Sequence, residues 1–233
     1  MKEKKFKLNP NFIIPKKKKG EIWLNLGSGV GLAEGFINVD NFFTLEDLKE
    51  GVRTKKGAFK NARITKDTEF VKADICNMPF PDNYADYIEC NDVIEHQPIN
   101  NVHKFLKEIY RVLKPGCKVG LSTTNFDELA RLWTLNITGN KMERQQDWDR
   151  LSTLQQIIYG NQAGPGEFHT VPFNPFLLGF YFQRSGFDLK NITINVYPTG
   201  TPYLAPQRAY DHVRTDWENV VVKTEQLWVE AIK

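Results

Sequence analysis

The sequence has few cysteines and no long apolar run near its start. Its three cysteines include no Cys-x-x-Cys pair, so neither a disulfide scaffold nor a structural zinc site is expected, and no metal site is predicted. The lysine-rich N-terminus lacks an apolar stretch long enough for a signal peptide or a membrane span. These absences predict a soluble, cytoplasmic protein.

What the sequence does contain is enough apolar material for one sizeable core. Of its 233 residues, 41% are hydrophobic and 12% are aromatic. This favours a single domain over 21–233, preceded by a lysine-rich leader over 1–20. Most of the formal net charge of +3 lies in that leader. We interpret the leader as a solvated tail, with a weak contact to nucleic acid, lipid or glycan as the alternative.

Short apolar runs alternate with amphipathic stretches, a pattern typical of strands and helices around a mostly parallel sheet. Strands are predicted at 21–26, 36–39, 69–73, 85–90 and 117–123, and a final antiparallel pair at 188–198 and 225–233. Segments that should be insertions or covering elements, where specificity usually lies on such a sheet, are 41–68, 126–170 and 199–220.

Two helices have clear predicted boundaries. The first carries apolar residues at helical spacing from Val102 to Leu113, and the Lys-Pro-Gly run that starts at Lys114 should end it. The second should begin with Asn174 as its N-cap, followed by proline at the first helical position, and should stop at Gly186.

The run WLNLGSGVGLAEGFINVD, residues 23–40, places Gly27, Gly29 and Gly31 directly after the first predicted strand. Glycines there allow a tight turn and let backbone N–H groups approach a ligand that a Cβ would push away. Asp40, at the end of the second strand, could then accept hydrogen bonds from the two hydroxyls of a ribose, so a nucleoside ligand is predicted. A plain strand-to-helix turn with similar glycines is the alternative.

Further blocks follow in order. EFVKADICNMPFPDNYADYIEC supplies Asp74 at the end of the third strand, DVIEH follows the fourth strand, and EIYRVLKPG precedes the fifth. Together with the glycine turn and Asp40, these blocks resemble the class I S-adenosylmethionine-dependent methyltransferases of the type 11 kind, from about residue 21 to 125. The resemblance implies a Rossmann-like α/β fold, with a seven-stranded, mostly parallel sheet, one antiparallel strand and helices on both faces.

The resemblance also implies that S-adenosylmethionine is the cofactor and lies over the carboxyl ends of the first four strands. Gly27, Ser28 and Gly29 would contact its methionine part, and Asp40 would bind its ribose hydroxyls. Asn25 stands where many relatives carry an acidic residue, so recognition of the methionine amine by a carboxylate is not expected there. An amide oxygen can still accept that hydrogen bond.

Other residues carried over from the family follow the third and fourth strands. Asp74 with the backbone of Ile75 would bind the adenine edge, Asn91 would face the sulfonium end, and His96 would close the same loop. A turn carboxylate is the alternative for Asp74, and a cap of the next helix is the alternative for His96.

The connection from Gly31 to Asp40 is short for parallel strands, whose crossover usually needs about a dozen residues. A shortened connection with at most one helical turn is implied. A missing crossover would weaken the role assigned to Asp40.

The implied chemistry is methyl transfer by in-line displacement, in which the cofactor carries the reactivity and the protein aligns the acceptor. The run IIYGNQAGPGEFHTVPFNP resembles a variable lid that would bring His169, Tyr159 and Gln162 near the mouth of the site. His169 and His96 are the candidate catalytic residues, and His169 is the candidate general base because the ordinary histidine pKa suits proton removal near neutrality. A structural role is the alternative for His169. Tyr159 and Tyr181 are expected to pack in the core.

The predicted acceptor is a small molecule or a glycan, methylated at oxygen or nitrogen. NDVI follows the fourth strand where an Asn/Asp-Pro-Pro-aromatic run would mark a nucleobase-amine methyltransferase. The insertions also lack the interleaved basic stripe of a nucleic-acid groove, so nucleic acid is an unlikely partner.

Two other function classes stay open. A methyltransferase fold that has lost activity and acts as a binding protein is favoured only by Asn25 and the short connection. An NAD-dependent oxidoreductase would share the glycine turn and the acidic residue. It would not account for the ADICNMPFPDN and RVLKPG blocks.

Overall fold

The described part of the chain forms one seven-stranded sheet and a small separate pair of strands. The computed structural model describes residues 16–50, 52–53, 59–60, 64–138, 152, 154–160, 162, 166–198 and 225–233. The strands of the main sheet are β1 (Trp23–Leu26), β2 (Ile37–Asp40), β5 (Glu69–Lys72), β6 (Ala85–Asn91), β7 (Leu113–Thr124), β8 (Ile192–Pro198) and β9 (Glu225–Ile232). The separate antiparallel pair is β3 (Val52–Arg53) with β4 (Phe59–Lys60).

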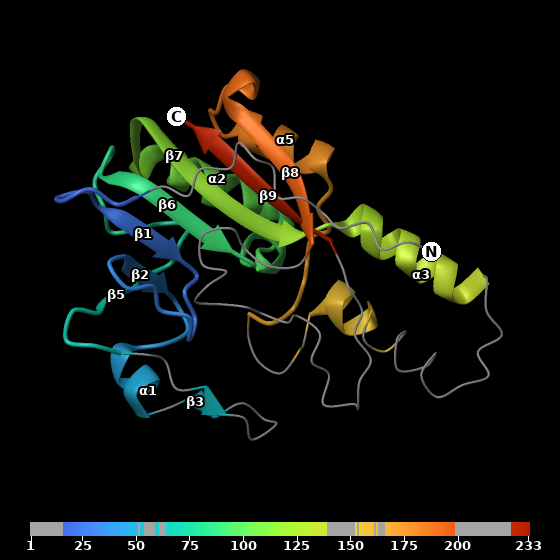
Figure 1. Ribbon diagram of the computed structural model, residues 1–233, viewed down its shortest axis with the longest axis horizontal. Helices are drawn as coiled ribbons and strands as arrows, with labels where there is room; N and C mark the ends of the chain where they lie inside the picture. Colours follow the sequence, from blue (N-terminus) through green and yellow to red (C-terminus); the bar gives the residue numbers. More distant parts are fainter. Residues whose placement is uncertain are drawn as a thin grey trace.

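The strand order is β5-β2-β1-β6-β7-β9-β8. Neighbours from β5 to β7 pair in parallel, and β9 pairs antiparallel with both β7 and β8. Figure 1 shows the arrows of β1, β6 and β7 pointing one way and the arrow of β9 pointing back between β7 and β8. This order and these directions confirm the predicted fold class and each predicted strand.

The strands separate two kinds of side chain because alternate residues point to opposite faces of a sheet. In β1, Leu24 and Leu26 are fully buried in the main hydrophobic core. Trp23 points to the opposite face, where its ring centroid lies 4.8 Å from that of Tyr87 and 5.2 Å from that of Phe36. One face of the sheet is therefore aliphatic, and the other begins with an aromatic cluster.

Helices α2 (Ile99–Val112) and α5 (Pro175–Arg184) pack on the aliphatic face, behind the sheet in Figure 1. The apolar stripe of α2 is fully buried against the strands, as its spacing predicted. The helix ends at Val112, just before the expected stop, because Leu113 already pairs with Ala85 as the first residue of β7.

Helix α5 begins and ends where its sequence predicted. The Asn174 side-chain oxygen accepts a hydrogen bond from the Leu177 N–H at 2.9 Å, which is the geometry of an N-cap. Gly186 follows the last turn with φ +115°, a conformation that favours glycine.

The remaining elements are short or lie at the border of the sheet. Helix α1 (Leu45–Glu50) and the β3–β4 pair lie in the segment 41–68, and α3 (Phe126–Thr138) begins the segment 126–170. Among the residues described, η1 (Ile94–His96) and η2 (Leu189–Asn191) are 3-10 turns. The segment 199–220 and residues 1–15 of the leader lie outside the described residues, so the domain boundaries stay predictions.

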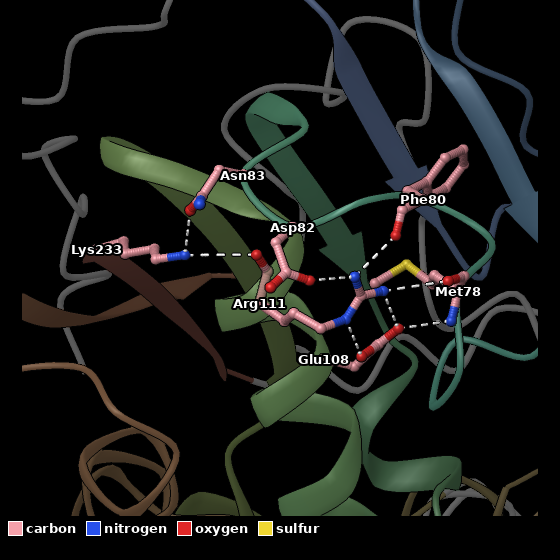
Figure 2. Close-up of polar contacts among 7 residues, drawn as sticks. All are labelled: Met78, Phe80, Asp82, Asn83, Glu108, Arg111 and Lys233. Carbon is pink, nitrogen blue, oxygen red and sulfur yellow. Dashed lines mark hydrogen bonds and ion pairs between the residues drawn. The ribbon is translucent and has the colours of Figure 1, made fainter.

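An arginine in α2 ties two of the sequence blocks together. The Arg111 guanidinium donates to the Glu108 carboxylate at 2.6 and 2.8 Å, to the Asp82 carboxylate at 2.8 Å, and to the carbonyls of Phe80 and Met78 at 2.8 and 3.1 Å (Figure 2). Glu108 also accepts from the Met78 N–H at 2.7 Å. The hydrogen bonds to these carboxylates raise the pKa of Arg111. The EIYRVLKPG block therefore holds the turn of the MPFPDN block on the helix.

The end of β9 is fixed to the same region. Lys233 donates through its side chain to the Asn83 side-chain oxygen at 2.7 Å and to the Arg111 carbonyl at 3.4 Å (Figure 2). Its own carbonyl accepts from the Gly116 N–H at 2.9 Å. These contacts anchor the antiparallel strand beside the turn that Arg111 holds.

Candidate functional site

The glycine turn lies at the carboxyl end of β1. Gly27 and Gly29 have φ values of +62° and +49°, which L side chains rarely adopt. A Cβ at Gly27 would lie 2.3 Å from Cγ2 of Val93, so the turn and the loop after β6 approach each other too closely for a side chain. The backbone is thus shaped as the glycine spacing predicted.

Asp40 ends β2 and reaches back to this turn. One carboxylate oxygen accepts from the Gly29 N–H at 2.8 Å, and the other accepts from the Phe42 N–H at 2.8 Å. The side chain is buried, and each oxygen keeps a lone pair that a hydroxyl could use. Asp40 therefore holds the turn in shape and presents a carboxylate beside it.

No helix or strand is formed by residues 27–36, which connect β1 to β2. The side chain of Asn38 fixes this connection by hydrogen bonds in place of a crossover helix. Asn38 accepts from the Asn25 side-chain amide at 2.8 Å and from the Ala33 N–H at 2.7 Å, and it donates to the carbonyls of Ala33, Phe36 and Glu69 at 3.1, 3.3 and 3.0 Å. This fully buried amide ties β1, β5 and the connection together. Asp40 consequently reaches the turn without a crossover helix.

Asn25 lies within this network, but only one of its two side-chain polar atoms takes part in it. Its side-chain nitrogen donates to Asn38 and, at 3.2 Å, to the Gly31 carbonyl. Its side-chain oxygen is buried and accepts no hydrogen bond within the described part of the chain. A buried acceptor without a donor is costly, so this oxygen marks a place for a ligand donor.

Asp74 and Ile75 follow β5, the neighbour of β2. The Ala73 N–H donates to the Asp40 carbonyl at 3.0 Å, which brings the start of this loop beside the carboxyl end of β2. The exposed Asp74 carboxylate accepts from the Cys76 N–H at 2.8 Å, as a turn carboxylate does, and Ile75 is buried in the core. A role of either residue at adenine stays a prediction.

Asn91, the last residue of β6, is held on both sides. Its side-chain nitrogen donates to the Glu89 carboxylate at 2.8 Å, and its side-chain oxygen accepts from the Ser122 hydroxyl at 3.1 Å. Its predicted position facing the sulfonium is not tested. Glu89, fully buried in the middle of β6 and bound to Asn91, was not singled out from the sequence, although a carboxylate in a largely apolar strand was a visible signal.

Beyond β6, three titratable groups from two segments meet. His96 ends η1, and its ring centroid lies 4.6 Å from that of His169. One ligand atom from each of Glu95, His96 and His169 lies within 4.8 Å of the other two. The structure thus brings both candidate catalytic histidines together and adds Glu95, which the sequence reasoning did not single out.

Backbone contacts hold the two segments of this cluster in place. The Glu95 carbonyl accepts from the Thr170 N–H at 2.7 Å, and the His169 N–H donates to the Tyr159 carbonyl at 3.0 Å. Nδ1 of His96 lies 3.0 Å from the Phe168 carbonyl, an oxygen that can only accept, so Nδ1 carries the proton. His96 does not cap α2, whose N-cap is Pro98.

Burial controls the charge of these groups. Desolvation, reinforced by the charge of Asp92, raises the pKa of Glu95 to about 8. Desolvation lowers the pKa of His96, although the Phe168 carbonyl and the carboxylates of Asp92 and Glu167 oppose the shift. Both groups are therefore pushed toward their neutral forms.

The two tyrosines differ from each other. Tyr181 packs against the core, with its ring centroid 6.1 Å from that of Phe173, as expected. Tyr159 is 52% exposed, so the expected core position is wrong for it. It ends the helical residues 154–159, and its backbone carbonyl rather than its ring contacts the site.

Comparison with known families identifies the domain that carries these residues. The family model described as a methyltransferase domain matches residues 24–121, which contain the glycine turn, Asp40 and every block from β5 to β7. Residues 24–121 form a methyltransferase domain. The predicted family, whose methyl donor is S-adenosylmethionine, is confirmed.

Curated relatives of this methyltransferase domain are longer proteins. The chain is 32% identical over 102 residues to a sterol 24-C-methyltransferase of Pneumocystis carinii, covering 42% of this chain and 26% of that protein. It is 25% identical over 165 residues to a sterol 24-C-methyltransferase of Aspergillus fumigatus, covering 70% of this chain and 38% of that protein. The chain thus spans well under half the length of these relatives.

Solved structures agree on the fold. An S-adenosylmethionine-dependent methyltransferase from Methanosarcina mazei superposes with a TM-score of 0.54 at 16% identity, covering 93% of this chain and 94% of that one. At this identity the likeness is one of fold alone. In the described residues, no helix is both long and apolar enough to cross a membrane.

Proposed function

We propose that the chain transfers a methyl group from S-adenosylmethionine to a small-molecule or glycan acceptor at the carboxyl edge of the sheet. The observation that carries this proposal is the Asp40 carboxylate hydrogen-bonded to the Gly29 N–H across a turn whose positive φ values at Gly27 and Gly29 favour glycine. This is the geometry that a ribose and a methionine chain require on one cofactor. The family of the domain supports the same donor.

Each part of the cofactor has a proposed partner. Asp40 would accept from the ribose hydroxyls with its remaining lone pairs, and the backbone of Ser28 and Gly29 would contact the methionine part. The buried Asn25 side-chain oxygen would accept from the methionine ammonium, which replaces the carboxylate found in many relatives. Asp74 and Ile75 would contact the adenine from the loop after β5.

The acceptor is proposed to react through oxygen or nitrogen. The groups near the carboxyl end of β6 are polar and can hydrogen-bond a hydroxyl or an amine: Asn91, His96 and His169. In the reaction, the acceptor atom forms a bond to the methyl carbon as the carbon–sulfur bond breaks, and S-adenosylhomocysteine leaves. His169 is proposed to take the acceptor proton, with His96 beside it.

Carbon methylation is a second candidate, because the curated relatives are named for transfer to carbon 24 of a sterol. An alkene acceptor has no proton to lose as it attacks, so it would not use a base at that step. Labelling separates the two candidates. Products made from S-adenosylmethionine with a 13C methyl group would show the carbon shift of an O-methyl, N-methyl or C-methyl group by NMR. A C-methyl product would favour the second candidate.

Isothermal titration with S-adenosylmethionine and S-adenosylhomocysteine tests the cofactor site directly. Wild-type protein should bind both, and Asp40→Ala should weaken binding by at least about 30-fold, since it removes charge-assisted hydrogen bonds worth roughly 2 kcal/mol or more. Asp67→Ala, at an exposed carboxylate before β5, is the matched control and should bind normally. Binding of NADH in place of these ligands would support the oxidoreductase alternative.

Failure of folded wild-type protein to bind either ligand would contradict the enzyme proposal. A scaffold role, or a site completed by a partner, would then explain the geometry of the turn better. Tight cofactor binding without turnover on any acceptor panel would support the binding-protein alternative. A cytoplasmic location and the absence of a nucleic-acid partner stay predictions.

A further inference from the structure

The cluster of Glu95, His96 and His169 has features that its proposed catalytic role does not use. Two imidazoles and a carboxylate converge within 4.8 Å although they come from segments more than 70 residues apart in the sequence. The backbone bonds of Thr170 to Glu95 and of His169 to Tyr159 fix both segments. The groups are thus assembled before any ligand arrives.

We propose that Glu95, His96 and His169 bind a divalent transition-metal ion of the zinc class. Two histidines with one carboxylate are a donor set that Zn²⁺, Co²⁺ and Fe²⁺ accept, with open positions left for water or substrate. This departs from the expectation of no metal, which rested on cysteine spacing alone.

The hydrogen bond of His96 supplies an independent observation. A metal-binding histidine almost always donates its other ring N–H to a carbonyl or a carboxylate, which fixes the ring and its tautomer. His96 donates from Nδ1 to the Phe168 carbonyl at 3.0 Å, so Nε2 is the nitrogen with a lone pair for a cation.

The carboxylate of Glu95 supplies a second observation. It is 1% exposed, and neither oxygen makes a hydrogen bond of good geometry within the described residues, although Thr123 and Thr124 lie near it. Among the described residues, no ion pair joins a lysine or an arginine to Glu95. A buried carboxylate whose oxygens lack hydrogen-bond partners is costly. A bound cation would supply the missing charge.

Metal binding here goes beyond the proposed methyl transfer and does not depend on it. With a cation bound, both imidazoles are ligands, so His169 would no longer act as the base. A hydroxyl of the acceptor that binds the cation would instead lose its proton to water more readily, because a divalent cation lowers the pKa of a bound oxygen. The two roles of His169 therefore exclude each other and can be told apart.

Cobalt titration tests the site without any assay of activity. Full-length, untagged protein is stripped with EDTA and titrated with Co²⁺, and visible d–d absorption is recorded. We expect one Co²⁺ per chain, displacement of its absorption by Zn²⁺, and a raised Tm of the protein with Zn²⁺, because a ligand that binds only the folded state stabilises it.

The variants are chosen to keep the fold. His169→Gln and Glu95→Gln preserve size, and each should weaken Co²⁺ binding by at least about tenfold, since losing even a group behind a metal ligand costs that much. His103→Gln is the matched control, because His103 lies on α2 and contacts Ser185 at 3.1 Å, outside the cluster. It should bind Co²⁺ as the wild type does.

Two outcomes would overturn the proposal. One is no Co²⁺ absorption and no Tm shift with Zn²⁺ in folded wild-type protein. The other is equal binding by wild type and by the folded double variant E95Q/H169Q, which would assign the metal to surface groups. Either can occur while S-adenosylmethionine still binds, so a failed metal site is distinguishable from a failed cofactor site.

Discussion

The two faces of the central sheet are built from different materials. The face that packs on α2 and α5 presents aliphatic side chains, such as Leu24, Ile88 and Leu121, which belong to the hydrophobic core and are fully buried. The opposite face carries polar residues in the same strands: Asn25, Asn38, Glu89, Asn91 and Ser122 are all buried. Apolar burial is non-directional, whereas hydrogen bonds fix positions. The first face therefore stabilises the fold, and the second holds the residues of the candidate site in fixed positions.

The largest expected effect lies on the aliphatic face. Phe105→Ala removes a fully buried ring from α2 and should lower the free energy of unfolding by about 3 to 5 kcal/mol. Urea denaturation measures the loss. The cofactor affinity of the fraction that stays folded should be unchanged, because the ring is on the face away from the glycine turn. A large loss of affinity in folded protein would break the comparison.

A smaller loss of stability with a larger effect on the site is expected on the polar face. Asn38→Ala leaves the Ala33 N–H and the Glu69 carbonyl without their side-chain partner and should cost about 2 to 3 kcal/mol. It should also weaken S-adenosylhomocysteine binding, since Asn38 shapes the connection that carries the glycine turn. Titration calorimetry beside urea denaturation would separate the two effects. Unchanged affinity would contradict the aligning role.

Two glycine substitutions compare how much space the packing leaves for an added methyl group on the two sides of the sheet. At Gly120, on the polar face, a Cβ would lie 2.5 Å from the Trp228 ring and 2.8 Å from the Tyr87 hydroxyl, so Gly120→Ala should cost about 1 to 3 kcal/mol. At Gly179 in α5, the nearest neighbour would be Ile194 at 3.6 Å. Gly179→Ala should stabilise the protein by up to about 1 kcal/mol, since alanine favours the helix. Thermal unfolding of both variants measures the contrast, and equal effects would contradict it.

The smallest effect is expected at the amino-terminal end of β6, where water screens charges. Burial alone would raise the pKa of Asp86, but hydrogen bonds from Lys114 at 2.7 Å and from the Ile22 N–H at 2.8 Å lower it. This stability is present above the pKa of an unfolded aspartate, about 3.9, and is lost as the pH falls through the lower folded value. Because Lys114 is partly exposed, Asp86→Asn should reduce stability at pH 7 by less than about 1 kcal/mol.

Urea denaturation at pH 7, 4 and 3 checks this last prediction. The difference between wild type and Asp86→Asn should shrink as the pH falls, because the wild-type carboxyl becomes protonated. A difference that grows toward acid would contradict the assigned direction of the shift.

Regular patterns explain which parts of the fold were predictable. Short apolar runs predicted the strands, and the cap at Asn174 and the stop at Gly186 predicted α5, because these signals act within a few residues of sequence. The glycine turn and Asp40 were predictable for a similar reason. Both follow directly from the ends of strands whose order is known for the family.

The parts that were missed depend on contacts between distant segments. Asn38 looks like a polar interruption of a strand until Ala33 and Glu69 are seen on either side of it. Glu95 and His169 are brought together by backbone hydrogen bonds between segments more than 70 residues apart, which no local pattern encodes. For His96, a helix cap was the alternative to a role in the site, and the structure instead shows its ring bound to the Phe168 carbonyl of that distant segment.

The position of β9 between β7 and β8 sets an order of events during synthesis. β8 leaves the ribosome before β9, yet among the described strands of the sheet it pairs with β9 alone. Until β9 emerges, the inner edge of β8 has no pairing partner. The strand that links β8, and the helix α5 packed on it, to β7 is then missing. The sheet can therefore close only when translation of these residues is finished, and the unpaired edge of β7 stays open to chaperones or to wrong partners until then.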